Sequence, residues 1–118
     1  MKPKISENEL ADILTKMPSN HELLLKRIRQ QSFRKVLIYV TAVIYKYDFI
    51  TMPQIRKKFS VSTRWAYEYL RQLTLLGLLK EEFIVGSNMK EYYPVKDNDG
   101  DAIIFRYYKE CKKYEESV

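Results

Sequence analysis

A series of helix and turn signals punctuates residues 50–95 and constrains the fold more than any other feature of this chain. Pro53 suits the first turn of one helix, and Ser62 is a favourable N-cap for another. Gly77 can adopt the left-handed conformation that ends a helix, and Gly-Ser-Asn at 86–88 forms turns readily. The segment therefore predicts a short helix, a tight turn, a second helix and a β-hairpin.

The second helix, over residues 62–76, has two distinct faces. At 100° per residue, the side chains expected inside are Ala66, Tyr69, Leu70, Leu73 and Leu76. Those expected together on the outside are Arg64, Tyr67, Glu68 and Arg71. The hairpin that follows should have strands at 78–84 and 90–95 around a tip at 85–89.

The upstream residues predict further helices. Ser6 and Glu9 form a capping box ahead of a helix over about residues 7–17. Residues 20–47 contain no Gly or Pro and predict either one long helix or two, with 29–32 as the favoured break. The side chains expected to be buried in its second half are Val36, Leu37, Val40, Val43, Ile44 and Tyr47. Those expected in its first half are Leu23, Leu24, Leu25 and Ile28.

The C-terminal residues predict a last helix over about 102–116, with Asp101 as its cap. Its apolar side would consist of Ile103, Ile104, Tyr107, Tyr108, Cys111 and Tyr114. A helix with so many tyrosines suggests a dimerisation element, and the alternative is that it packs back onto the domain.

Length and composition favour one globular domain. The chain has 118 residues, of which 46% are hydrophobic and 31% charged, enough for a single core. We divide it into a helical extension at 1–31, a core at 32–95 and a C-terminal helix at 96–118.

Its longest apolar run, 36–45, falls far short of the roughly 20 residues of a membrane span. No secretory signal is evident at the N-terminus, and the single cysteine, Cys111, fits a reducing compartment, so we expect a cytoplasmic protein that does not contact a membrane.

Positive charge is concentrated in the middle of the sequence. Residues 26–80 hold twelve basic side chains against two acidic ones, a net +10, whereas residues 1–25 and 81–118 are −1 and −3. This distribution fits a polyanionic partner, although lysine-rich helices are also often merely solvated.

Catalytic and metal-binding patterns are not evident in the sequence. The single histidine, His21, has no acid or nucleophile partner in sequence, and there is no glycine-rich phosphate loop. The aspartates at 97–101 do not match a calcium loop, because Tyr108 stands where the bidentate glutamate belongs. We therefore expect no enzymatic activity, no cofactor and no metal site.

Residues 33–95 resemble winged helix-turn-helix transcriptional regulators. The resemblance lies in an apolar strand, a short positioning helix, a turn ending in Val61-Ser62, a second helix, and Leu-Gly-Leu-Leu at 76–79 entering the hairpin. It implies a mainly α fold with a small β-hairpin wing, here with extra N-terminal helices and a C-terminal helix. Trp65 and Leu75 depart from the family pattern, and we expect Trp65 to pack on Tyr69 and Leu75 to meet a flanking helix or a second subunit. The lysine, isoleucine and tyrosine bias resembles that of archaeal, archaeal viral or plasmid proteins.

The resemblance also implies which residues contact DNA. Base readout would come from Thr63, Arg64, Tyr67, Glu68 and Arg71. Phosphate contacts would come from Arg56, Lys57, Lys58 and Ser62, and wing contacts from Ser87, Asn88 and Lys90. Each group of residues also has a purely structural alternative. Arg64 and Glu68 are four residues apart and could form an ion pair along the helix. Residues 56–58 could be a solvated patch, and the wing could be a plain hairpin.

These residues predict a sequence-specific double-stranded DNA-binding protein that regulates transcription, as a homodimer formed through the N- and C-terminal helices. The competing functions are a protein-interaction module in a transcription or replication assembly and a non-specific DNA-coating protein.

Overall fold

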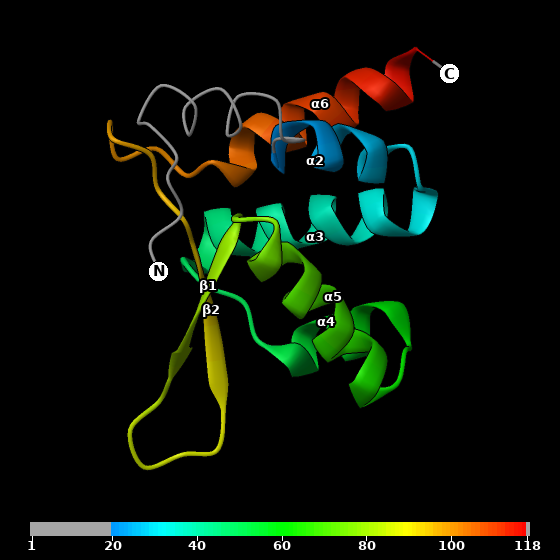
Figure 1. Cartoon of the computed structure of the whole chain (residues 1–118). Helices are drawn as coiled ribbons and strands as arrows, with labels where there is room; N and C mark the ends of the chain where they lie inside the picture. The colour runs from blue at the N-terminus through cyan, green and yellow to red at the C-terminus, as the bar shows by residue number, and fades with distance from the viewer. Residues whose placement is uncertain (1–19, 118) are drawn as a thin grey trace, which may run out of the picture.

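The computed structural model describes residues 20–117, which form five helices and one two-stranded antiparallel sheet (Figure 1). The helices are α2 (Asn20–Ile28), α3 (Gln31–Tyr47), α4 (Met52–Phe59), α5 (Thr63–Leu75) and α6 (Ile104–Glu116). The strands are β1 (Leu79–Phe83) and β2 (Lys90–Pro94). The helix expected over residues 7–17 lies outside the described residues.

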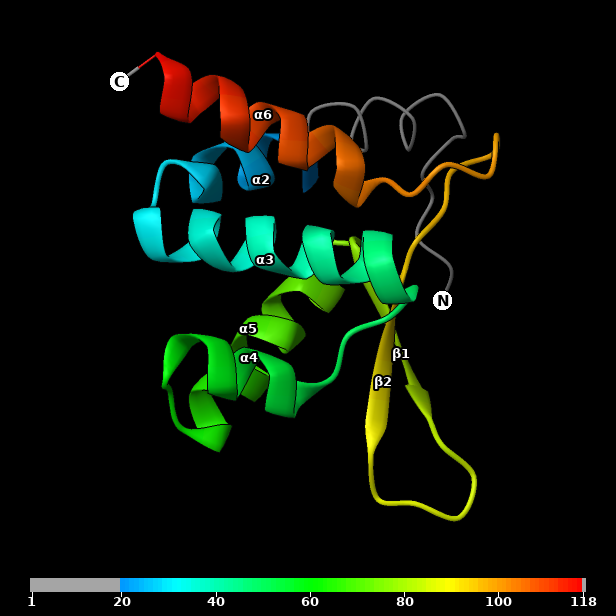
Figure 2. The same cartoon turned by 180° about the vertical axis from the view of Figure 1, so that it is seen from behind.

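Helix α3 forms the middle layer of the molecule. Helices α2 and α6 lie on one side of it, and α4 and α5 lie on the other (Figures 1 and 2). The hairpin extends away from the C-terminal end of α3. The side chains that fill the space between these layers include the fully buried Leu37, Val40, Ile55, Leu70, Leu73, Leu78 and Ile104.

Residues 20–47 form two helices, separated at Arg29 and Gln30 within the stretch that the sequence favoured as a break. The backbone of Gln30 is extended, with φ −80° and ψ 120°, which interrupts the helical path. In α2, Leu24 and Ile28 are buried, but Leu23 is exposed, so its expected burial was wrong. It lies one residue before Leu24 and therefore points to a different side of the helix.

Helix α3 buries the residues expected of it, with one exception. Its inner face includes Val36, Leu37 and Val40, but Tyr47 is 53% exposed, so the expectation for this residue was wrong. Asp48 adopts a left-handed conformation with φ 72°, and its N–H donates to the Ile44 carbonyl at 2.8 Å. Tyr47 is thus the last residue of the helix, and its side chain lies largely in solvent.

Helix α4 begins and ends through local backbone chemistry. The Thr51 N–H donates to Gln54 Oε1 at 2.8 Å, and Pro53 occupies the first turn, as the sequence predicted. Ser60, in a left-handed conformation with φ 53°, ends the helix. The resulting turn leads directly into α5.

Both predicted ends of α5 are confirmed. Ser62 Oγ accepts the N–H of Trp65 at 3.1 Å, which makes Ser62 the N-cap. At the other end Gly77 has φ +83°, and the Leu78 N–H donates to the Leu73 carbonyl at 3.0 Å. This is the hydrogen-bonding pattern of a left-handed glycine helix end, and it turns the chain into β1.

The hairpin is held both along its strands and at its base. β1 and β2 pair from Leu79 opposite Pro94 to Phe83 opposite Lys90. Ile50 forms an isolated bridge with Tyr92, through hydrogen bonds of 3.0 and 2.9 Å. Helices α3, α4 and α5 with this hairpin form a winged helix-turn-helix, the mainly α fold that the sequence predicted.

Helix α6 packs against α2 and α3 of the same chain, burying Ile104, Tyr107 and Cys111. The alternative of packing back onto the domain is thus confirmed, while dimerisation stays a prediction. The expected cap was wrong, because the N-cap is Ile103. The Asp101 N–H instead donates to Asp97 Oδ1 at 3.0 Å, which holds Asp101 in the preceding loop.

Candidate nucleic-acid interface

Helix α5 presents an exposed polar face opposite its buried one. Ala66, Leu70 and Leu73 face the core, as expected. The exposed side chains on the outer face are Thr63, Arg64, Tyr67, Glu68 and Arg71. All five residues predicted to read bases are therefore available on the surface of one helix.

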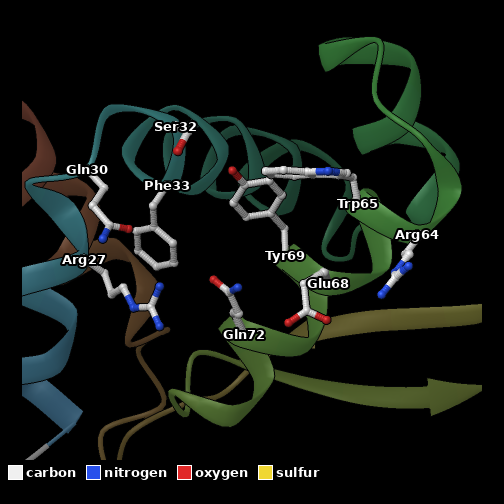
Figure 3. A pocket seen from close by; sticks show the side chains of 9 residues that line it. All are labelled: Arg27, Gln30, Ser32, Phe33, Arg64, Trp65, Glu68, Tyr69 and Gln72. Carbon is white, nitrogen blue, oxygen red and sulfur yellow. The ribbon is translucent and has the colours of Figure 1, made fainter.

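The outer face of α5 is divided between two hollows. The first, which we call the α2–α5 pocket, has a volume of about 560 Å³ (Figure 3). Its polar lining consists of Arg27, Gln30, Ser32, Arg64, Glu68 and Gln72, and its aromatic lining of Phe33, Trp65 and Tyr69. Arg27 and Gln30 lie at one end of the pocket and Arg64 lies at the other (Figure 3).

The second hollow, which we call the wing pocket, lies between α5 and the hairpin and has a volume of about 440 Å³. It is lined by Tyr67, Arg71, Thr74, Leu75, Glu81, Lys90 and Tyr92. The predicted readout residues thus occupy two flanks of α5: Arg64 and Glu68 line the α2–α5 pocket, whereas Tyr67 and Arg71 line the wing pocket.

Glu68 forms an ion pair different from the one weighed in the sequence. Its Oε1 lies 3.3 Å from Arg71 Nη1, three residues later, and among the described residues it forms no ion pair with Arg64. Both partners of the observed pair are exposed, so water screens their attraction. The contact leaves the Arg64 guanidinium available and offsets the negative charge that Glu68 would bring towards phosphate.

Three exposed cations lie on α4 next to the start of α5. Arg56, Lys57 and Lys58 all face solvent, as predicted. Arg56 Nη1 donates to Thr63 Oγ1 at 3.4 Å, and Lys58 Nζ lies 5.7 Å from the centre of the Tyr39 ring. The Ser62 hydroxyl is occupied as the cap of α5 but remains exposed.

Some of the wing residues predicted to contact DNA already contact other residues of the chain. Lys90 Nζ lies 3.3 Å from Glu81 Oε1 and 5.1 Å from the centre of the Phe83 ring. Ser87 Oγ accepts the N–H of Met89 at 3.1 Å, which stabilises the tip, and Asn88 is exposed. Two of the three predicted wing residues therefore already have intramolecular partners.

Sequence reasoning missed the apolar character of the wing. Val85 is fully exposed, and Phe83 and Met89 are also largely open to solvent. Tyr92 forms the base of this region: its hydroxyl donates to Glu81 Oε2 at 3.1 Å. Burial and this hydrogen bond raise the pKa of Tyr92 well above its ordinary value, so the phenol stays neutral.

Trp65 packs against Tyr69, as predicted, with ring centroids 5.3 Å apart. It is nonetheless 56% exposed and lines the α2–α5 pocket. The signal that could have revealed its role was its position one residue after Arg64, within the first turn of the helix. Leu75 is also exposed and lines the wing pocket, where sequence reasoning had expected a flanking helix or subunit.

Between residues 20 and 117, no cluster of three or more His, Cys, Asp or Glu side chains is placed to hold a metal ion. Within the same range, no helix has the length and apolarity needed to cross a bilayer.

Comparisons with known proteins give two structural neighbours. No protein-family model matches the chain, and no curated protein matches it. One neighbour is a transcriptional regulator homologue from Pyrococcus horikoshii OT3, with 17% identity and a TM-score of 0.47, covering 80% of this chain and 88% of that one. The other is AbfR with its disulfide formed, with 16% identity and a TM-score of 0.44, covering 93% of this chain and 83% of that one. The fold assignment rests on the helix and hairpin arrangement itself.

Proposed function

We propose that this chain is a cytoplasmic transcriptional regulator that binds double-stranded DNA sequence-specifically. The observation that carries the proposal is the exposed face of α5, where Arg64, Tyr67 and Arg71 are accessible on a helix that is capped at both ends. A helix presented in this way fits the major groove, which is about 12 Å wide.

Within this proposal, α5 reads bases and α4 anchors the phosphates. Arg64 has a planar guanidinium that can bind a guanine edge through two hydrogen bonds. The exposed Lys57 on α4 would contact phosphate, which carries no sequence information directly. The two residues should therefore affect DNA binding in different ways.

Selection from a random oligonucleotide pool tests whether the chain prefers a sequence. We expect an enriched motif, and fluorescence anisotropy on that motif should then show loss of preference for Arg64→Ala. Lys57→Ala should weaken selected and random duplexes alike and make the salt dependence shallower. Equal loss on both duplexes for Arg64→Ala would exclude its role in base readout, and a pool without an enriched motif would indicate a non-specific DNA-coating protein.

A second candidate function is a protein-interaction module in a transcription or replication assembly. The hairpin supports this candidate. The carboxylates of Glu81 and Glu82 would repel phosphate, and the fully exposed Val85 at the tip could contact an apolar surface of a protein. If random duplex fails to bind even at low salt, this candidate replaces DNA binding.

We further propose that the chain acts as a homodimer. The interface predicted from the sequence used the N- and C-terminal helices; we now place it on the C-terminal α6 and on α3, which share an apolar groove of about 510 Å³ lined by Tyr45, Phe105 and Tyr108 among others. Two copies with α5 in successive major grooves would require half-sites about 34 Å apart and hence a palindromic operator. A non-palindromic motif bound by one protomer would contradict the dimer but not the DNA binding.

A further inference from the structure

The α2–α5 pocket contains a cation, Arg27, that the predicted contacts leave unused. Arg27 and Gln30 come from the end of α2 and the turn after it, outside the helix-turn-helix itself. Within residues 20–117, Arg27 is exposed and forms no ion pair. Arg64 lies at the opposite end of the same pocket (Figure 3).

The balance of charge in the pocket favours an anion. Arg27 and Arg64 face a single carboxylate, that of Glu68. Glu68 is already paired with Arg71, at 3.3 Å, on the side of α5 that carries the wing pocket. Lys35 adds another cation in an adjoining hollow of about 320 Å³, which shares Ser32, Trp65 and Tyr69 with the α2–α5 pocket.

We propose that the turn between α2 and α3 is a second DNA-backbone contact, and that one strand passes through the α2–α5 pocket. Arg27 would hold a phosphate of that strand with Gln30 beside it, and the exposed Trp65 ring would pack against the adjoining deoxyribose. The proposal rests on the proposed function, because it requires duplex DNA on α5.

The position of the pocket relative to the wing supports this assignment. A helix in the major groove is flanked by both sugar-phosphate strands. The wing pocket holds Arg71 and Lys90 on one flank of α5, each beside a glutamate, and we place one strand there. The other strand then runs along the opposite flank, where Arg27, Gln30 and Trp65 lie. The two pockets together make the footprint on the DNA wider than the helix-turn-helix alone would give.

Substitution of Arg27 tests the contact in the full chain. We expect Arg27→Ala to weaken binding about tenfold, as expected for loss of one charge-assisted hydrogen bond, on the selected motif and on random duplex alike. The slope of log affinity against log salt should become shallower by about 0.9, the value for one phosphate. Arg27→Lys should recover most of the affinity. The matched control is Lys109→Ala, which removes one exposed cation from α6 on the far side of α3 and should leave binding unchanged.

Phosphate ethylation interference locates the contact on the DNA. For the unaltered chain, ethylation of one phosphate on the strand away from the wing should reduce binding, and the same ethylation should have no further effect on Arg27→Ala. Trp65, the single tryptophan of the chain, provides a second readout, because its emission should become protected from acrylamide quenching when DNA binds.

The outcomes separate this proposal from the function on which it rests. If Arg27→Ala behaves like Lys109→Ala while Arg64→Ala loses sequence preference, the second contact is wrong and DNA binding by α5 stands. If an acidic peptide but no duplex protects Trp65, the pocket binds protein and both proposals fail. Failure of the unaltered chain to bind any duplex likewise overturns both.

Discussion

Arg34 connects three helices through one side chain. Its Nη1 donates to the Ile28 carbonyl at the end of α2, at 2.9 Å, and its Nε lies 3.6 Å from Glu115 Oε2 on α6. The guanidinium also lies 4.7 Å from the centre of the Tyr114 ring. Only 11% of this side chain is exposed, so most of these contacts are shielded from water. In the sequence Arg34 was merely one of twelve cations, because nothing local marks a residue whose partners are distant.

We predict that Arg34→Ala destabilises the fold by about 1–3 kcal/mol, because it leaves the Ile28 carbonyl without its donor and removes the ion pair with Glu115. Urea unfolding followed by circular dichroism measures the change. The control is Lys109→Ala, which removes an exposed cation from α6. Its free energy of unfolding should stay within about 0.5 kcal/mol of that of the unaltered chain. A midpoint for Arg34→Ala that matches this control would contradict the prediction.

Because of Cys111, we expect the free energy of unfolding to vary with pH in the alkaline range. Burial raises the pKa of its thiol from an ordinary 9.0 to about 11. Because the neutral thiol is favoured in the folded state, the associated stability is fully present below pH 9 and is lost as pH rises through about 11. We predict that the free energy of unfolding of the unaltered chain falls more steeply over this range than that of Cys111→Ala. The difference between the two chains removes the contribution of the tyrosines, and parallel curves would argue against the assignment.

At the scale of elements, local signals predicted the helix-turn-helix and hairpin well. Pro53, Ser62 and Gly77 act through their own backbone neighbourhoods, so their effects could be recognised without a structure. The start of the last helix was predicted less accurately, because Asp101 lies in the preceding loop, where its N–H donates to Asp97 Oδ1, and α6 begins only at Ile104.

The candidate site was predictable only in part. Helical periodicity predicted that Arg64, Tyr67 and Arg71 are exposed. It could not show that Arg64 lines one pocket while Tyr67 and Arg71 line another. That Arg27 lines the same pocket as Arg64 depends on the angle at which α2 meets α3, which is a tertiary property. The ion pair of Lys90 with Glu81 was not visible in the sequence for a related reason, since the two side chains meet only when the two strands pair.

Gly77 sets the junction between α5 and β1, and we predict that Gly77→Ala costs about 1–2 kcal/mol of stability. The added Cβ would meet Asn20 Nδ2 at an ordinary 3.5 Å, so the cost arises from the left-handed backbone, φ +83°, rather than from crowding. Gly77→Asn should lose less, because asparagine tolerates this conformation better. Thermal unfolding of both variants measures the two losses of stability. Equal losses for Gly77→Ala and Gly77→Asn would indicate crowding rather than backbone strain.

At the scale of the whole molecule, α3 separates a surface suited to DNA from one suited to a second copy. Tyr45 is 81% exposed on the second surface and lies 6.2 Å, centre to centre, from the Phe105 ring of α6. Helices α4 and α5, which carry the proposed DNA contacts, lie on the opposite side of α3 (Figure 2). Two copies could therefore associate through α3 and α6 while both α5 helices remain accessible.

We predict that the unaltered chain forms the proposed dimer and that Tyr45→Glu is monomeric, because the substitution would place a charge in an apolar interface. Light scattering after size exclusion should give twice the chain mass of 14.2 kDa for the unaltered protein and a single mass for the variant. Tyr47→Glu is the control, since Tyr47 is exposed on the same helix but does not line the groove. An unaltered protein that is monomeric at micromolar concentration would rule out the proposed interface.

The paired hairpin also limits how copies of this chain can assemble. Ile50 bridges β2 at Tyr92, whereas the outer edge of β1 pairs with no strand among the described residues. That edge carries three consecutive charged residues, Lys80, Glu81 and Glu82. Charges on an edge strand discourage another chain from adding to the sheet. The hairpin is thereby protected against open-ended, fibril-like growth, even though its apolar tip reaches into solvent.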